Sequence, residues 1–522
     1  MKNILTIAIA CAGLMSFTAC SDFLKEEPRT DLVTESFFKT QAQAEGAINT
    51  LYRTGAPTHY ADFGSAYHHT FLSYADQLTG YFSNTKENQE LQCLYSRTLV
   101  RQAHTIEMSG TMDGIWDGCY KGVNRANSAI KYIPDIKIDE PGVKERLLSE
   151  AKFFRAFNYF FLVKTFGAVP FYTEPYEVAE NMELERTDVA TIYAQIEKDL
   201  TEAMEVLPDA RFTDDHKINK HTVAMLLTDV YMYQHKYAEA AKTAQSIINS
   251  KKYELLKNTD KGANSAYNQL RKLDNNSEVV YSYEHDPLIS SSNWLPTYAF
   301  DNQATAVFDK YAIIERTHGA LPRYINVYEK NDLRAQNQQF FVWSYTNETN
   351  GKTWSSKEPN SWYYFEQDAM ENTGKGGKDW NIYRYAETLL SAAESIAQSN
   401  GDMSLAANYL AQVKVRANME DKSVEEIAAS LPKDKQAFIE ECWNERLREL
   451  PLEFKMWDLC VRVGKFPNIS STTPGEISWV NLVGATNASG AVIKDSDLLW
   501  PISTNEIQRN PNLEQNPGYA RE

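Results

Sequence analysis

Two stretches of the chain repeat small and aromatic residues at the spacing of packed helices, and this pattern restricts the fold more than any other feature. The first stretch (residues 221–253) and the second (residues 385–417) are both typical of a helix, a turn and a second helix. Alanine at the packing positions lets two helices approach closely. The sequence therefore predicts tetratricopeptide-like helix pairs in a mainly α-helical protein. The packing residues are Ala224, Leu227, Tyr231, Tyr237, Ala240, Ala244 and Ile247 in the first stretch and Tyr385, Ala386, Leu389, Ala393, Ala397, Leu405, Tyr409, Leu410, Val413 and Ala417 in the second.

Two further helices are indicated by their ends. Thr40 with Gln43 three residues later forms a capping box, which predicts a helix starting near residue 41. Gly167 with Pro170 marks the exit of a longer helix. The stripe of this helix that faces the core contains Leu147, Ala151, Phe154, Asn158 and Phe161. No linker rich in Pro, Gly or Ser divides the chain, so we expect one interwoven body.

Between about residues 275 and 380 the helical spacing fades, and the sequence becomes rich in Asn, Ser, Gly, Pro and aromatic residues. We call this segment the excursion. A loop-rich segment of this length is more often functional than idle. Its aromatic residues include Trp294, Tyr298, Tyr324, Trp343, Tyr345, Trp354, Trp362, Tyr363 and Tyr364. A similar cluster follows the first helix, with Tyr60, Phe63, Tyr67, Tyr74, Tyr81 and Phe82.

The N-terminus has the features of an export signal. Lys2 precedes an apolar run, residues 4–17, that is too short to span a bilayer comfortably, and two small residues come directly before Cys20. Lipoprotein processing joins diacylglycerol to a cysteine in this place. The sequence therefore predicts a lipoprotein signal peptide over residues 1–19 and a lipid anchor on Cys20. A plain signal peptide is the alternative, because Phe17 stands where such signals usually have leucine.

Charge and cysteine content narrow the class of partner. With 53 basic and 70 acidic residues the net charge is −17, which argues against nucleic acid and against adhesion to anionic lipid. Membrane contact is then expected only through the N-terminal lipid.

Apart from Cys11 in the signal and Cys20, four cysteines allow three disulfide pairings, and buried free thiols are the default expectation. They are Cys93, Cys119, Cys442 and Cys460.

Catalytic motifs do not emerge from the sequence. It contains no HExxH zinc helix, GxSxG elbow, P-loop or GxGxxG turn. The adjacent His68 and His69 suit neither the i, i+4 pair of a zinc helix nor a triad. Glycosidase carboxylates have no fixed spacing, so the abundant acids neither support nor exclude hydrolysis. We expect no enzyme activity, no cofactor and no metal site, and a glycan-active enzyme is a minor alternative.

Four blocks of sequence follow one another along the chain. They are SEAKFFRAFNYFFLVKTFGAVPF from Ser149, IYRYAETLLSAAES from Ile382, ERLRELPLEFKMWDL from Glu445 and LWPISTNEIQRNPNLEQNPGY from Leu499. In this order, behind the cysteine of the signal, they resemble the SusD/RagB family of outer-membrane nutrient-binding lipoproteins. The resemblance implies a SusD-like helical body, with an N-terminal part over residues 20–270 and a C-terminal part over residues 271–522 interwoven into one body.

The resemblance also implies a function. Family members are not enzymes, and most bind a glycan at the cell exterior and pass it to a SusC-like TonB-dependent transporter. Sugar rings stack on Trp and Tyr, and sugar hydroxyls bind Asn, Asp and Arg. The glycan-binding residues that we expect are Trp294, Trp343, Trp354 and Trp362 as stacking platforms, Tyr67, Tyr81 and Tyr298 as secondary platforms, and Asn84 as a polar partner. Two alternatives stay open, a peptide-binding member of the family and a scaffold without a ligand of its own.

The charged residues within the blocks are expected to support the fold rather than to bind a ligand. We predict buried or half-buried ion pairs and caps for Arg384, Glu387, Glu445, Arg446, Glu449 and Asp458. The third block departs from the family at two places. Pro451 interrupts a helical stretch, and Phe454 stands where the family usually has glycine.

Overall fold

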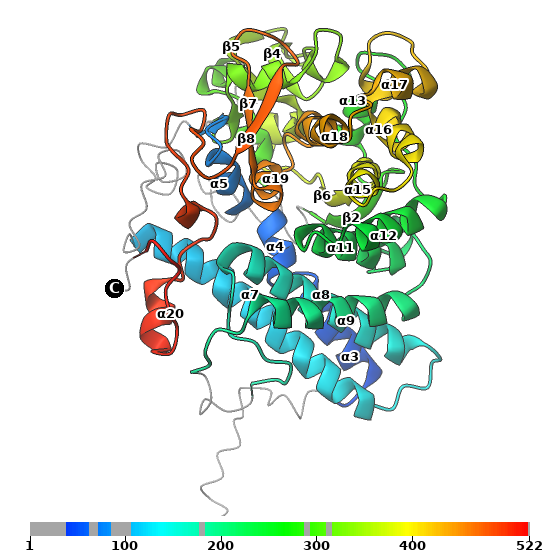
Figure 1. Ribbon diagram of the computed structural model, residues 1–522, viewed down its shortest axis with the longest axis vertical. Coiled ribbons are helices and arrows are strands. Elements are labelled where there is room, and N and C mark those ends of the chain that lie inside the picture. The colour runs from blue at the N-terminus through cyan, green and yellow to red at the C-terminus, as the bar shows by residue number, and fades with distance from the viewer. Residues whose placement is uncertain are drawn as a thin grey trace, which may run out of the picture.

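The structure of the protein is a computed structural model that describes residues 38–61, 71–84, 106–176, 183–286, 293–308 and 316–519. Helices make up most of these segments, as the sequence predicts (Figure 1). Within them, no helix is both long enough and apolar enough to cross a membrane. Several residues named from the sequence lie outside the described segments, namely the signal peptide with Cys20, and Phe63, Tyr67, His68, His69 and Cys93.

The regular elements alternate between helices, short turns and two-stranded ribbons. The helices are α3 (Gln41–Leu51), α4 (Ala56–Ala61), α5 (Phe71–Gln77), α7 (Ile106–Tyr132), α8 (Val143–Phe166), α9 (Val189–Val206), α10 (Phe212–Asp215), α11 (Lys220–Tyr233), α12 (Tyr237–Asn249), α13 (Ala266–Lys272), α14 (Leu295–Tyr298), α15 (Tyr385–Gln398), α16 (Met403–Ala417), α17 (Val424–Ser430), α18 (Lys435–Glu449), α19 (Met456–Val463) and α20 (Thr504–Arg509). The strands are β1 (Phe82–Ser83), β2 (Val279–Tyr283), β3 (Gly319–Ala320), β4 (Phe341–Thr346), β5 (Thr353–Ser361), β6 (Trp380–Arg384), β7 (Lys465–Ile469) and β8 (Ile477–Asn481). They pair antiparallel as β1–β3, β2–β6, β4–β5 and β7–β8.

The helices stack in chain order. In Figure 1, α7, α8 and α9 form the lower layer, α11 and α12 lie above them, and α15, α16 and α18 follow. Both predicted helix pairs are confirmed, as α11 with α12 and as α15 with α16, and the pairs pack on each other through α12 and α15. Where α11 packs on α12, the Thr228 hydroxyl donates to the carbonyl of Ala224 (2.8 Å) and forms a hydrogen bond with the Thr243 hydroxyl (2.9 Å). A buried threonine is tolerated here because its hydroxyl is fully paired.

The long helix α8 forms the centre of the lower layer. It ends at Gly167, whose φ of 73° is a left-handed conformation that glycine adopts without strain. The predicted stripe is buried, including the polar Asn158. The Asn158 amide donates to the Phe154 carbonyl (2.7 Å) and accepts from the Ala56 backbone (2.9 Å), so it joins α4 to α8. The predicted capping box at Thr40 is also present, at the start of α3.

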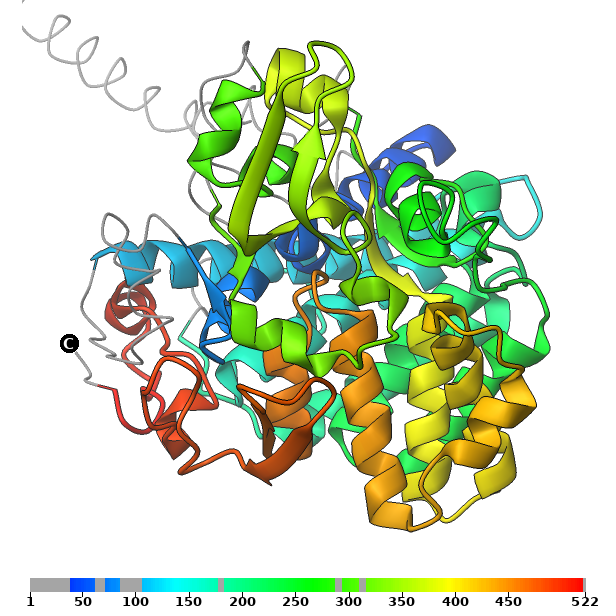
Figure 2. The ribbon, with the colours of Figure 1, turned by 90° about the horizontal axis from the view of Figure 1, so that it is seen from above.

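The excursion is an insertion between two paired strands. It leaves after β2 and returns at β6, and the register pairs Val279 with Arg384 and Tyr283 with Trp380. Between these two strands, the described residues form α14, β3, short helical turns and the β4–β5 hairpin, which turns at Gly351 (φ 70°), and are otherwise irregular. In Figure 2 the excursion, green to yellow-green, is raised toward the viewer, and the C-terminal red segment lies away from it.

The junction between α18 and α19 explains the unusual Phe454. The helix ends at Glu449, before Pro451, and Phe454 adopts a positive φ of 56°. A side chain in this conformation costs roughly 1–2 kcal/mol. The Phe454 ring stacks on Trp380 (5.0 Å between centroids) and meets His318 edge-on (4.6 Å). This packing offsets the strain, so a phenylalanine can stand where the family usually has glycine.

Candidate functional site

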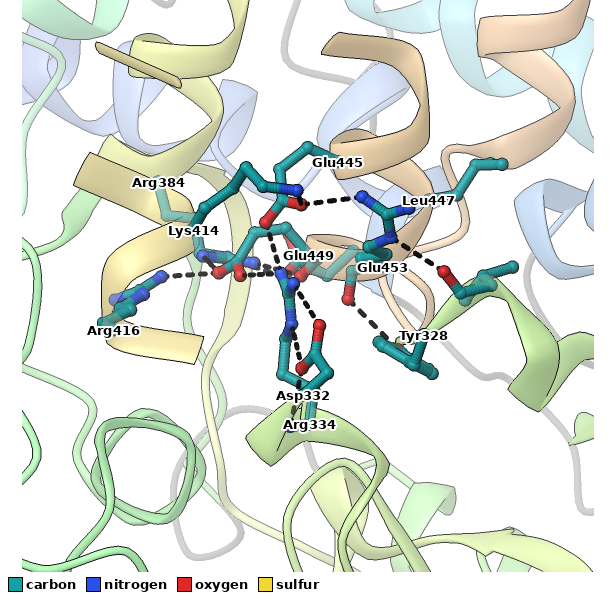
Figure 3. A network of polar contacts seen from close by, with 12 residues as sticks. Tyr328, Asp332, Arg334, Arg384, Lys414, Arg416, Glu445, Leu447, Glu449 and Glu453 are labelled. Carbon is teal, nitrogen blue, oxygen red and sulfur yellow. Dashed lines mark hydrogen bonds and ion pairs between the residues drawn. The ribbon is translucent and has the colours of Figure 1, made fainter. Parts of the chain in front are cut away.

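A buried network of ion pairs fixes the excursion to the helical body (Figure 3). Arg334, from the excursion, donates to the carboxylates of Glu445 (2.7 Å) and Glu449 (2.9 Å) on α18. Its other nitrogens bond both oxygens of Asp332 (2.9 and 2.7 Å). All three guanidinium nitrogens of Arg334 thus donate to carboxylates, and a buried arginine needs such partners. The excursion therefore rests on a fixed base.

Glu449 is the centre of this network. Its carboxylate also accepts from Arg384 (2.7 Å) and Arg416 (2.5 Å), so it joins α18 to the start of α15, to α16 and to the excursion. Burial alone would raise the pKa of Glu449, but the arginines outweigh burial and lower the pKa to about 2. The carboxylate is fully buried and ionised, and it has no open face for a ligand.

The ion pairs predicted from the sequence are confirmed. Arg446 pairs with Glu387 (2.8 Å), and the half-buried Asp458 pairs with Lys164 of α8 (2.6 Å). The sequence did not identify the remaining members of the network, which are Glu278, Asp332, Arg334, Lys414, Arg416, Arg448, Glu441 and Glu453. Arg448 and Glu453 belong to the third block itself and Glu441 lies one helical turn before it, whereas the others come from distant segments that no spacing rule relates to the block.

Trp354 and Trp362, two of the four expected platforms, are core residues of the excursion. The Trp362 ring stacks on Phe365 (4.3 Å between centroids), and its indole nitrogen donates to Asn268 (2.9 Å). The Trp354 ring meets Phe300 edge-on (5.1 Å), and its nitrogen donates to Asp301 (3.0 Å). Both side chains are buried, so in this structure neither offers a ring face to a ligand.

The expected secondary platforms that the structure describes are buried as well. Tyr81 is 1% exposed, and its hydroxyl donates to the Pro467 carbonyl (2.9 Å) while accepting from the Ile469 backbone (2.9 Å). Tyr298 and Asn84 are 1% and 2% exposed. A sugar needs an open ring face or an open amide, and none of these three side chains offers one in this structure.

Trp294 and Trp343 are half-buried and keep part of their rings at the surface. Trp294 precedes α14, and the Lys375 ammonium lies 5.0 Å from its ring centroid. Trp343 lies on β4, and its backbone nitrogen donates to the Asn337 side chain (2.8 Å). No ring contact among the described residues joins the two tryptophans. They are two separate candidate platforms on one excursion.

The described cysteines are structural. Cys119, Cys442 and Cys460 are buried and free, as expected. Burial raises the pKa of each thiol, so these side chains are neutral at physiological pH. They behave as small apolar core residues.

Comparison with known proteins gives one consistent result. Residues 213–519 match the SusD family, and residues 22–232 match a family described as starch-binding and associating with the outer membrane. SusD-like protein P2 of Formosa agariphila is 27% identical over 97% of this chain and 98% of its own length.

Solved structures share the fold. A SusD superfamily protein from Parabacteroides distasonis superposes with a TM-score of 0.78 at 23% identity, covering 92% of this chain and 99% of its own. The surface glycan-binding protein A of Bacteroides thetaiotaomicron, solved with laminarihexaose, gives 0.68 at 19% identity, covering 92% of this chain and all of its own. The family model matches more than half of the sequence, and the solved neighbours share the mainly helical body. The chain therefore belongs to the SusD family.

Proposed function

We propose that the protein binds a glycan without catalysis at the outer face of the outer membrane and delivers it to a SusC-like TonB-dependent transporter. The match of both halves of the chain to the two family descriptions carries this proposal. Two structural neighbours are named for the ligands laminarihexaose and laminarin, which supports a glycan as the ligand class. The net charge of −17 favours a neutral glycan over a polyanion.

Trp294 and Trp343 are the residues of the excursion that we propose as stacking platforms. Each keeps part of an indole ring at the surface of a segment that the Arg334 ion pairs hold in place. A rigid support lowers the entropy lost on binding. Stacking on an indole and hydrogen bonding by neighbouring polar groups is the usual chemistry of sugar recognition.

The test is a binding screen of the chain that starts at Ser21, using retarded migration in polysaccharide gels and calorimetry with oligosaccharides. Laminarin and starch fragments are the first probes, and a peptide mixture is included. We expect one glycan class to bind and Trp294→Ala or Trp343→Ala to weaken it at least tenfold. Trp479→Ala is the matched control, because Trp479 is also half-buried but lies on β8, outside the excursion.

Two outcomes of this screen would change the proposal. Binding of peptides alone would show that the cargo is wrong. New reducing ends after incubation with a bound polysaccharide would show that the non-catalytic assignment is wrong.

Anchoring and delivery need a separate experiment. We propose that Cys20 carries the lipid and that the protein faces the cell exterior. Protease shaving of whole cells should remove the protein, and Cys20→Ser should release it from the membrane. A tagged full chain should copurify with a TonB-dependent barrel. If no barrel copurified although the protein bound a glycan, the delivery role would be contradicted and the glycan binding would stand.

A further inference from the structure

A cavity of about 340 Å³ opens where the exit of α8 meets the C-terminal tail. Its walls come from α7, from residues 170–176 and from α20, which lies beside α7 in Figure 1. We call it the exit cavity. It does not include the excursion, and the sequence analysis assigned no ligand to its residues. The side chains that matter for its chemistry are those of Trp116, Tyr120, Tyr172, Tyr176, Asp117 and Arg509.

Aromatic rings form a continuous wall of the exit cavity. The rings of Tyr120 and Tyr172 are nearly parallel (11°) with centroids 5.9 Å apart, and Tyr176 meets Tyr172 edge-on at 4.2 Å. Trp116 extends the wall behind Tyr120 (5.0 Å). The three tyrosines are half-buried, so each keeps ring surface on the open volume. A pyranose ring stacks on such a surface.

The segment that carries Tyr172 and Tyr176 is held rigidly from behind. The Tyr159 hydroxyl donates to the Tyr172 carbonyl (2.7 Å) and accepts from the Tyr172 backbone nitrogen (2.9 Å). The Tyr176 backbone nitrogen donates to the Asn124 side chain (2.7 Å). These bonds come from α8 and α7 and fix the loop before a ligand arrives. A site organised in advance loses less entropy on binding.

The chain on either side of α20 is also fixed, by contacts with the end of α8. The Trp500 backbone donates to the Thr165 carbonyl (2.8 Å). The Asn516 amide donates to the carbonyls of Phe166 (3.0 Å) and Trp500 (2.7 Å). The C-terminal tail is therefore bound to the end of α8, and α20 keeps its place beside α7.

Polar groups at the rim supply hydrogen bonds for hydroxyls. The side chains of Asp117 and Arg509 are 60% and 61% exposed, with 3.6 Å between carboxylate and guanidinium. Glu506, whose side chain is much less exposed, also pairs with Arg509. The carboxylate of Asp117 accepts and the guanidinium of Arg509 donates, which suits the hydroxyls of a sugar. With two carboxylates to one guanidinium, the rim repels a polyanion.

We propose that the exit cavity is a second glycan site that binds a short stretch of a neutral pyranose oligosaccharide. Tyr172 and Tyr176 are its stacking platform, and Asp117 and Arg509 bind hydroxyls. This inference rests on the proposed glycan binding and adds a site that the tryptophans of the excursion do not form. The volume lies at the small end of ligand pockets, which span about 300–1,000 Å³. It therefore suits a few sugar units rather than a long chain.

The test uses the chain from Ser21 with laminarihexaose and maltohexaose as neutral probes and polygalacturonate fragments as the anionic comparison. Tyr176→Ala is the main variant, because Tyr176 lies at the edge of the wall and is not packed against the hydrophobic core. Tyr176→Trp should keep the stacking surface. Tyr231→Ala is the matched control, since Tyr231 is also half-buried but lies on α11. Thermal unfolding of each variant confirms that it is folded.

Hydroxyl-radical footprinting, read by mass spectrometry, reports on the exit cavity even if the excursion also binds. We expect a neutral probe to protect Tyr172 and Tyr176 at least twofold. Tyr176→Ala should abolish protection of Tyr172 and weaken binding at least fivefold in a background that carries Trp294→Ala and Trp343→Ala. Tyr176→Trp and Tyr231→Ala should stay within twofold of that background.

The outcomes separate this inference from the proposed function. If a neutral glycan binds but Tyr172 and Tyr176 stay unprotected, the exit cavity is not a site and the proposed function stands. If only the anionic fragments protect these tyrosines, the assignment to neutral glycans is wrong. If no glycan binds the unmodified protein, the proposed function fails, and the inference fails with it.

Discussion

The excursion and the exit cavity collect the same residue types, but they use them differently. In the excursion Trp354 and Trp362 pack against other rings and are buried, so they build a core where regular structure is scarce. At the exit cavity, the half-buried Tyr172 and Tyr176 line an open volume of about 340 Å³. Aromatic density in irregular chain therefore does not by itself identify a ligand surface. Rings contact one another in both regions, and what distinguishes the two is whether the side chains are buried in a core or stay half-buried beside an open volume.

The largest effect expected in this comparison comes from removing the ion pairs that fix the excursion to α18. Glu449→Ala leaves Arg334, Arg384 and Arg416 without a shared acceptor, and we expect a loss of about 3–5 kcal/mol in the free energy of unfolding. Urea unfolding measures this loss. Glu440→Ala on the same helix is the control, because Glu440 is half-buried and, among the hydrogen bonds of the described residues, its carboxylate accepts only from Gln436.

Glu440→Ala should change the free energy of unfolding by less than about 1 kcal/mol. Equal losses in both variants would contradict a special role of the Glu449 network. Footprinting at Tyr176 should be unchanged in folded Glu449→Ala, because the exit cavity does not depend on this network.

The contrast between core rings and surface rings can be tested within the excursion itself. Trp362→Ala removes the stack on Phe365 and the hydrogen bond to Asn268, and we expect a loss of about 3–5 kcal/mol. Trp343→Ala, at a half-buried position, should cost about 1 kcal/mol or less. Denaturant unfolding of both variants gives the comparison. If the two losses were alike, burial would not separate core rings from platforms.

Lowering the pH tests the ion pairs of Glu449 that fix the excursion to the helical body. The pKa of Glu449 is lowered from 4.5 to about 2 in the folded protein, so its stabilisation is complete above about pH 4.5 and is lost as the pH falls toward 2. This shift corresponds to roughly 3 kcal/mol. The difference in stability between the unmodified protein and Glu449→Gln should shrink between pH 5 and pH 2.5. A difference independent of pH would show that the carboxylate is not selectively stabilised in its ionised form.

The smallest expected effect concerns the hairpin of the excursion. Gly351 has a φ of 70°, and a Cβ placed there would meet nothing within 4 Å, so Gly351→Ala should cost only the backbone strain, about 1 kcal/mol. Gly46→Ala is the control, because Gly46 lies in α3 with equally open space. That substitution should stabilise by roughly 0.5–1 kcal/mol, since alanine favours a helix. Equal signs in thermal unfolding would contradict the argument from φ.

Much of the fold could be predicted because helical spacing is a local signal. The pairs α11–α12 and α15–α16, the capping box of α3 and the glycine that ends α8 all follow from residues within a few positions of one another. The β4–β5 hairpin was missed, although its signal was present. Asn350 and Gly351 stand between two stretches rich in aromatic and β-branched residues, which is typical of a hairpin turn.

The candidate site could be predicted only in part. The sequence correctly singled out the excursion as irregular and aromatic, but it could not decide which rings were accessible. Trp343 and Trp354 lie on paired strands of one hairpin, and yet one is half-buried and the other is buried. The difference comes from Phe300, which covers Trp354 from another part of the chain.

By itself, the sequence determined the helical class, the helix pairs, the family and the structural role of the charged residues in the third block. These depend on short-range spacing and on motifs that a linear chain displays directly. Only the tertiary structure decided that Glu449 binds three arginines from separate segments and that the exit of α8 and the C-terminal tail enclose a cavity. Burial and enclosure are properties of surfaces that meet in space, and residues far apart in sequence contribute both sides of each.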